Sequence, residues 1–137
     1  MIPKSRSEIM RAVRRENTGP ELAVRKAAHR LGLRFRLYRK DLPGTPDLIF
    51  PKHRTCLFVH GCFWHRHPGC VKASTPKSRR DYWLPKFERN VERDRDNEEA
   101  LRRLGWRVVT IWECETRDPE GLEDRLRGTF GLPPAPR

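Results

Sequence analysis

Residues 42–60, LPGTPDLIFPKHRTCLFVH, decide the fold. The stretch opens with a turn, Leu42–Pro46, that holds two prolines and one glycine. Two apolar runs follow, Asp47–Phe50 and Thr55–His60, and both contain β-branched and aromatic residues over the length of a strand. We therefore predict two neighbouring strands joined by a short connection.

Further elements are predicted on both sides of these strands. Thr18 as a cap and Pro20 in the first turn indicate a helix that runs to about Leu31 and ends at Gly32. The other predicted elements are a strand at Arg34–Tyr38, a polar helix from Tyr82 to Leu104 with Pro85 near its start, a strand at Trp106–Trp112 and a helix at Pro119–Leu126. This order indicates an α/β fold with a central mixed sheet flanked by helices.

The length of 137 residues suits one domain. Within it we expect residues 1–17 to form a basic helix or arm, and residues 131–137 to form a disordered tail. Because 30 Lys and Arg face 18 Asp and Glu, the formal charge is +12, which favours a polyanionic partner such as nucleic acid. An acidic protein surface, or plain solvation, is the alternative explanation of this charge.

Membrane binding is not expected, because no apolar run approaches the roughly 20 residues of a spanning helix. The N-terminus is basic but lacks the apolar centre of a secretory signal, so we expect a cytoplasmic protein with reduced cysteines. The four cysteines are then core, metal or catalytic residues rather than a disulfide framework.

The loop Cys62–Cys70 gathers two cysteines and two histidines, which suits a zinc site. Cys62 and Cys70 are the expected thiolate ligands, one of His65 and His67 is the third, and Cys114 is the candidate fourth. Residues two apart in an extended segment point the same way, so spacing does not choose between the histidines. The remaining histidine can be a general base or a phosphate contact. Unrelated thiols and surface histidines are the alternative, and Cys56 is expected in the core.

Two carboxylates are candidates for a second, catalytic metal site. Asp47 begins a strand beside the one that ends at His60, so a carboxylate and an imidazole can meet there and hold Mg²⁺ against a phosphodiester. Glu21 falls on the apolar stripe of its helix, where a carboxylate must be paired or useful. The alternatives are a turn cap for Asp47 and a helix-start cap for Glu21.

Aromatic residues stand beside basic ones at two places. Phe63 and Trp64 lie in a polar loop, while Tyr82 and Trp83 follow the basic stretch Lys72–Arg80. Such pairs suit stacking on bases or wedging into a base step. Minor core residues that cover the zinc are the alternative, above all for Tyr82.

Five motifs in one order resemble the very short patch repair (Vsr) endonucleases. They are Leu42–Asp47, Phe58–His65, Asn90–Asp94, Gly105–Val108 and Trp112–Cys114, and the likeness spans residues 4–126. The resemblance implies a restriction-endonuclease-like core of the PD-(D/E)XK superfamily with a structural zinc. It also implies Mg²⁺-dependent nicking of DNA on the 5′ side of a thymine mispaired with guanine.

The resemblance further implies a role for individual residues. Asp47 and the main-chain carbonyl of Val59 are the implied Mg²⁺ ligands, and the implied catalytic residues are Asp47, His65, Glu21 and His60. The implied zinc ligands are Cys62, His67, Cys70 and Cys114. The expected DNA contacts are Phe63, Trp64, Trp83, Lys86, Arg79, Arg80 and Asn90. Two features depart from the family, namely Val59 in place of a threonine and one extra residue between His67 and Cys70.

The expected partner is double-stranded DNA with a T:G mismatch, bound by a monomer that works alongside other mismatch-repair proteins. Two other functions fit the same residues. One is a zinc-containing DNA-binding module without catalysis, which would bind DNA and never nick it. The other is a nuclease of the same fold with a different target, such as a restriction or modified-base endonuclease.

Overall fold

A computed structural model describes residues 18–63, 65–70 and 78–133. Three predictions fall wholly or partly outside these ranges: the N-terminal basic helix or arm, the wedge residue Trp64, and most of the basic stretch that precedes residue 78. The end of the predicted tail, residues 134–137, also lies outside them.

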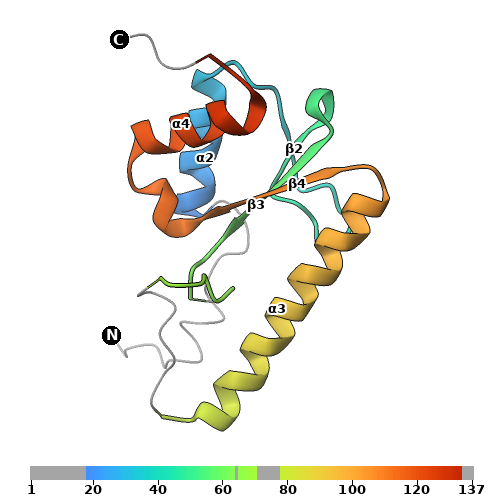
Figure 1. The fold of residues 1–137 in the computed structure, drawn as a ribbon, viewed down its shortest axis with the longest axis vertical. Coiled ribbons are helices and arrows are strands. Elements are labelled where there is room, and N and C mark those ends of the chain that lie inside the picture. The colour runs from blue at the N-terminus through green and yellow to red at the C-terminus, as the bar shows by residue number, and fades with distance from the viewer. Residues whose placement is uncertain (1–17, 64, 71–77, 134–137) are drawn as a thin grey trace, which may run out of the picture.

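The described residues form a four-stranded mixed sheet in the order β1-β2-β3-β4 (Figure 1). The strands are β1 (Arg36–Leu37), β2 (Leu48–Phe50), β3 (Thr55–His60) and β4 (Arg107–Trp112). The first three run antiparallel to their neighbours, and β3 pairs with β4 in parallel, so the predicted mixed α/β sheet is confirmed.

Helices cover both faces of the sheet. On one side lie α2 (Gly19–Arg30) and α4 (Pro119–Phe130), and on the other lies the long α3 (Arg80–Arg103), as Figure 1 shows. Short 3₁₀ turns follow β2 at Pro51–His53 and β4 at Glu113–Thr116. The second turn carries Cys114 away from the end of β4 towards α4.

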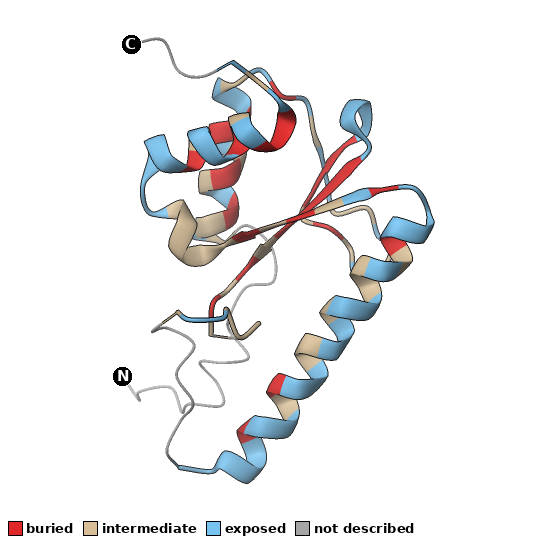
Figure 2. Ribbon diagram, in the orientation of Figure 1, coloured by how far each residue is buried: buried red, intermediate tan, exposed pale blue. Residues whose placement is uncertain are grey.

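Alternation along the strands divides the core into two layers. Leu48 and Phe50 of β2 pack with α2 and α4, whereas Ile49 between them packs with Leu101 of α3. Successive side chains of a strand point to opposite faces of the sheet, so neighbouring apolar residues of β2 enter different layers of the core. Figure 2 shows buried residues along β2 and β3 and a mostly exposed N-terminal half of α3. That half extends past the sheet, as Figure 1 shows.

Element ends differ from the sequence predictions by two residues or more at three places. The first strand covers only Arg36–Leu37, since Tyr38 adopts a left-handed φ of 49° that ends it. Helix α3 starts at Arg80, two residues early, and carries Pro85 in its second turn. Helix α4 continues past Leu126 because Phe130 lies one turn further on the same buried face, and Gly131 caps it with a φ of 65°.

Candidate active site and metal centre

A cleft of about 1070 Å³ opens between the start of α2, the end of β3 and the middle of α3. It is lined by the predicted catalytic residues Glu21, Asp47, His60 and His65, together with Val59. The fold therefore brings these residues, which are separated by up to 44 positions (65 − 21), to one concave surface. Concave sites at which a few polar side chains converge are where ligands bind most often.

Asp47 is held just before β2 with its carboxylate against β3. Its Oδ2 accepts a hydrogen bond of 2.7 Å from the main-chain amide of Val59. The preceding turn lies close to α3, since a Cβ on Gly44 would come within 2.9 Å of the Asn97 side chain. A glycine at this point, with a φ of 75°, therefore allows the turn that delivers Asp47 to the cleft.

Burial raises the pKa of Asp47 to about 7, and the nearby charge of Glu21 adds to this increase. A carboxylate held at such a cost suits a cation, which reverses the electrostatic penalty. Mg²⁺ is commonly bound by one or two carboxylates together with phosphate oxygens of the substrate. Asp47, beside the main chain of Val59 and open to the cleft, fits that donor set.

Glu21 is buried at the first turn of α2, with only 3% of its surface exposed. Its main-chain amide donates to the Thr18 hydroxyl at 3.3 Å, which confirms the predicted helix cap. Its carboxylate accepts hydrogen bonds from Arg25 Nη2, at 3.3 Å, and from the hydroxyl of Tyr38. The charged form of this buried carboxylate is therefore paired, as its place on the apolar stripe requires.

His60 and His65 stack face to face, with ring centroids 3.9 Å apart and planes 8° from parallel. Burial, with the neighbouring His65, lowers the pKa of His60 to about 4, so its imidazole is neutral near pH 7. His65 Nδ1 lies 2.6 Å from Asp94 Oδ2. This contact leaves Nε2 of His65 as the ring nitrogen that Asp94 does not engage.

Asp94 is a site residue that the sequence analysis did not single out, although it ends the motif Asn90–Asp94. It comes from α3 and forms, with His60 and His65, a group whose ligand atoms lie within 4.8 Å of one another. The spacing of polar residues on this helix is a signal that could have found it. The residues with that spacing, Asn90, Asp94, Asn97 and Glu98, all line the cleft. Polar residues at this three- and four-residue spacing share one helix face.

A second cluster contains the four predicted zinc ligands, Cys62, His67, Cys70 and Cys114. Their donor atoms all lie within 4.8 Å of one another. His67 Nδ1 is 3.6 Å from Cys62 Sγ and 3.4 Å from Cys114 Sγ. Tetrahedral zinc, with its usual Zn–S and Zn–N bonds, separates such atoms by about 3.5 Å.

The chemistry of this donor set also fits zinc. Burial raises the pKa of the Cys62 thiol to about 11, so a thiolate forms there only when a cation lies beside it. Three sulfurs and one imidazole nitrogen make a closed set with no open position, which is the pattern of structural rather than catalytic zinc. Cys56, in contrast, is fully buried within β3, as predicted.

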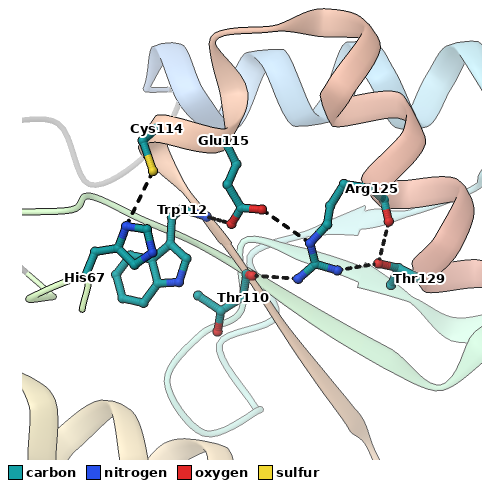
Figure 3. Close-up of polar contacts among 7 residues, drawn as sticks. All are labelled: His67, Thr110, Trp112, Cys114, Glu115, Arg125 and Thr129. Atoms are coloured by element: carbon teal, nitrogen blue, oxygen red, sulfur yellow. Dashed lines mark hydrogen bonds and ion pairs between the residues drawn. The ribbon is translucent and has the colours of Figure 1, made fainter. Parts of the chain in front are cut away.

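Helix α4 fixes the turn that carries Cys114, as Figure 3 shows. Glu115 accepts a hydrogen bond of 3.0 Å from the Trp112 main chain and one of 3.3 Å from Arg125 Nε. Arg125 also donates to the Thr110 carbonyl at 3.5 Å and to the Thr129 hydroxyl at 2.9 Å. The Trp112 ring in turn stacks on His67, with centroids 4.3 Å apart. These contacts orient two of the four candidate ligands from outside the Cys/His cluster.

Comparison with known proteins identifies the chain's relatives. The family model described as DNA mismatch endonuclease Vsr matches residues 1–72. The chain belongs to the Vsr family. It is 42% identical over 120 residues to the DNA mismatch endonuclease Vsr of Escherichia coli (strain K12), covering 88% of this chain and 76% of that protein.

Two further relatives are named as nicking enzymes. The type II nicking enzyme V.XorIIP of Xanthomonas oryzae pv. oryzae is 57% identical over 127 residues, covering 93% of each chain. The type II nicking enzyme V.NmeAIP of Neisseria meningitidis serogroup A is 40% identical over 121 residues, covering 88% of this chain and 86% of that one. The Vsr likeness thus extends over most of the chain.

The aromatic residues of this Vsr-family chain are divided between interior and surface. Trp83 is only 3% exposed and lies against Phe63 and Phe87, with ring centroids 6.0 and 5.9 Å away. Its ring is therefore covered in this structure. Tyr82 is 39% exposed and lies between Arg79 and Lys86, each within 4.6 Å of its ring centroid.

The remaining predicted DNA contacts of this Vsr-family chain lie on α3 or at its start. Arg79 and Arg80 are exposed, Lys86 is half-buried beside Tyr82, and Asn90 lines the cleft. Their places fit a duplex lying along the N-terminal half of α3.

Among the described residues, no helix is long and apolar enough to cross a membrane.

Proposed function

We propose that this chain nicks one strand of duplex DNA on the 5′ side of the thymine in a T:G mismatch. The reaction is a Mg²⁺-dependent phosphodiester hydrolysis on a restriction-endonuclease-like core that zinc stabilises. The observation that carries the proposal is the cleft itself. The His65–Asp94 pair and the Asp47 carboxylate line this one cleft beside α3. Membership of a family described as DNA mismatch endonucleases supports the choice of substrate.

Asp47 and the Val59 carbonyl are the residues that would hold Mg²⁺. When bound, the ion supplies positive charge that polarises the phosphodiester and favours ionisation of water. The Val59 amide donates to Asp47 Oδ2 and so fixes the carboxylate for this task. Because the proposed ligand is a main-chain carbonyl, valine serves as well as threonine at this position.

His65 is the proposed general base, and it accepts the proton of the attacking water at Nε2. Asp94 fixes the ring by its contact with Nδ1 and stabilises the imidazolium that results. His60, neutral and stacked on His65, is suited to donate a hydrogen bond to a phosphate oxygen rather than to neutralise it. Glu21, paired with Arg25, accepts a hydrogen bond from water in the cleft and so orients it.

Strand opening is assigned to the aromatic residues. Phe63 and Trp64 are proposed to enter the duplex beside the mismatch, where the cost of unstacking is lowest. Trp83 would join them once the loop that carries Phe63 moves away from α3. Basic residues at the start of α3, Arg79 and Arg80, supply phosphate contacts that weaken with salt.

A nicking assay on end-labelled duplexes tests the proposal. The full chain, loaded with zinc, is incubated with T:G, U:G and fully matched duplexes, each with Mg²⁺ and with a chelator. We expect Mg²⁺-dependent cleavage of only the mismatched thymine strand. Cleavage of the matched duplex would favour a restriction-like target, and binding without any nick would favour a DNA-binding module.

A further inference from the structure

The loop between β3 and α3 contains a turn with the hydrogen bonds of a helix end. The His65 amide donates to the Gly61 carbonyl at 3.1 Å, and the His67 amide donates to the Cys62 carbonyl at 3.0 Å. Between them, Arg66 adopts a left-handed φ of 55°. A bond that spans five positions across one left-handed residue is one of the two bonds of the Schellman motif, in which the left-handed residue is usually glycine.

The left-handed residue separates the two histidines. In an extended segment His65 and His67 would point to the same side. Here His65 contacts Asp94 at 2.6 Å, whereas His67 contacts Cys114 at 3.4 Å and stacks on Trp112. The reversal at Arg66 thus assigns one histidine to each cluster, a choice that spacing alone does not make.

The Arg66 side chain ties this turn to α3. Its guanidinium lies over the Phe87 ring, 4.0 Å from the centroid, and Nη1 donates to the Phe63 carbonyl at 3.3 Å. Phe87 is buried and stands seven residues, about two helical turns, before Asp94 (94 − 87). Arg66 therefore connects the turn to the helix that carries the partner of His65.

We propose that Arg66 is a positioning residue that couples the zinc centre to the catalytic cleft. Its backbone conformation sends His67 to the cysteines and His65 to the cleft. Its guanidinium holds the turn at a fixed distance from α3, and hence His65 against Asp94. The part that concerns catalysis rests on the proposed function, whereas the part that concerns zinc does not.

Two substitutions separate the backbone from the side chain. Arg66→Gly removes the guanidinium and accepts the left-handed conformation, whereas Arg66→Val removes the guanidinium and resists that conformation. Arg66→Ala and Arg95→Ala form a matched pair, because each removes one arginine from the same shallow depression beside Phe87, and Arg95→Ala is the control. Zinc affinity is measured by competition with a chromophoric chelator. Nicking is measured as steady-state kcat and KM on the T:G duplex.

We expect Arg66→Gly to keep the parent's zinc affinity within about 3-fold and to lower kcat by about 10-fold with little change in KM. Arg66→Val should weaken zinc binding by about 10-fold or more relative to Arg66→Gly, and Arg95→Ala should resemble the parent. If Arg66→Val does not fold, Arg66→Ala takes its place, and its zinc affinity should lie below that of Arg66→Gly.

Equal zinc affinities for Arg66→Gly and the Val and Ala variants would overturn the backbone part of the proposal. Parent-like kcat in Arg66→Gly would overturn the coupling to α3. Should the parent fail to nick the T:G duplex, the proposed function is wrong. The zinc measurements would then still decide whether Arg66 builds the metal centre.

Discussion

His65 Nδ1 lies 2.6 Å from Asp94 Oδ2, a contact that joins the loop after β3 to the middle of α3. A carboxylate in this position fixes the tautomer and orientation of an imidazole and stabilises its protonated form. The loop also holds three of the four proposed zinc ligands. The pair therefore connects the loop of the Cys/His cluster to the cleft in which we place the chemistry.

Asp94→Asn should lower kcat for nicking by about 10- to 100-fold, because an amide orients His65 without stabilising the positive charge of its protonated ring. Substrate KM should change little, since Asp94 contacts His65 rather than DNA in our account. Asp96→Asn, on the same helix, is the matched control. A parent-like kcat in Asp94→Asn would remove Asp94 from the mechanism.

Mg²⁺ binding should depend on pH through Asp47. Because burial raises the pKa of Asp47 to about 7, a proton must leave before the carboxylate can bind a cation. Mg²⁺ affinity should therefore rise by about 10-fold per pH unit below pH 7 and level off above it. Calorimetry in buffers of different ionisation enthalpy measures both the affinity and the proton released. The range from pH 5 to pH 8 runs from about two units below this pKa to about one unit above it. Mg²⁺ affinity that is independent of pH over this range would contradict the account.

The same raised pKa predicts a stability cost that the site carries for its function. The folded-state pKa of Asp47 lies above its unfolded value, so stability is lost as pH rises from about 4 through about 7. Asp47→Asn removes this loss and should raise the free energy of unfolding by about 1–3 kcal/mol at pH 8 without Mg²⁺. At pH near 4 the two proteins should unfold at nearly equal denaturant concentrations. A variant less stable than the parent at pH 8 would show that the carboxylate is not strained by burial.

Zinc should be a structural requirement. Cys70→Ala should lose stoichiometric zinc and unfold at a lower temperature, and added Mg²⁺ should not restore its nicking, because the four donor atoms form one closed set. Cys56→Ala, which removes a buried thiol outside the cluster, should keep one zinc per chain. Metal analysis and thermal unfolding of both variants decide the matter. Full zinc content in Cys70→Ala would disprove the ligand assignment.

Arg125 should support the zinc centre from α4. Arg125→Met removes its contacts to Glu115, Thr110 and Thr129, and should weaken zinc binding by about 10-fold. Arg30→Met is the control, because Arg30 is exposed and forms only a long ion pair of 3.7 Å with Glu123 among the contacts described for it. Equal zinc affinities for both variants would show that the Arg125 network does not orient Cys114.

The sheet was predictable from sequence because its strands carry strong local signals. Leu48 and Phe50 fall on one face and Ile49 on the other, as period-two alternation requires. The end of α4 was missed because Gly128 lies inside the helix, whereas the buried Phe130 extends it beyond the predicted end. Burial against distant residues decided that boundary, and local propensity did not.

The candidate site was predictable in its residues more than in its geometry. The clustering of Cys62, His67 and Cys70 was visible in the sequence, but the choice between His65 and His67 came only from the family resemblance. The physical reason is the left-handed Arg66, which breaks the alternation that spacing assumes. The polar spacing along α3 marks Asp94 as part of one helix face, but its contact with His65 and the covered ring of Trp83 depend on how α3 packs beside the loop.

The most direct test of the central claim measures single-turnover nicking of a T:G duplex by Asp47→Asn and His65→Ala. His53→Ala, which changes a histidine packed on Phe130 outside the cleft, is the control. Our account predicts that both site variants lose at least about 100-fold in rate while keeping one zinc and a cooperative unfolding transition. Nicking by either variant at the parent's rate would contradict it.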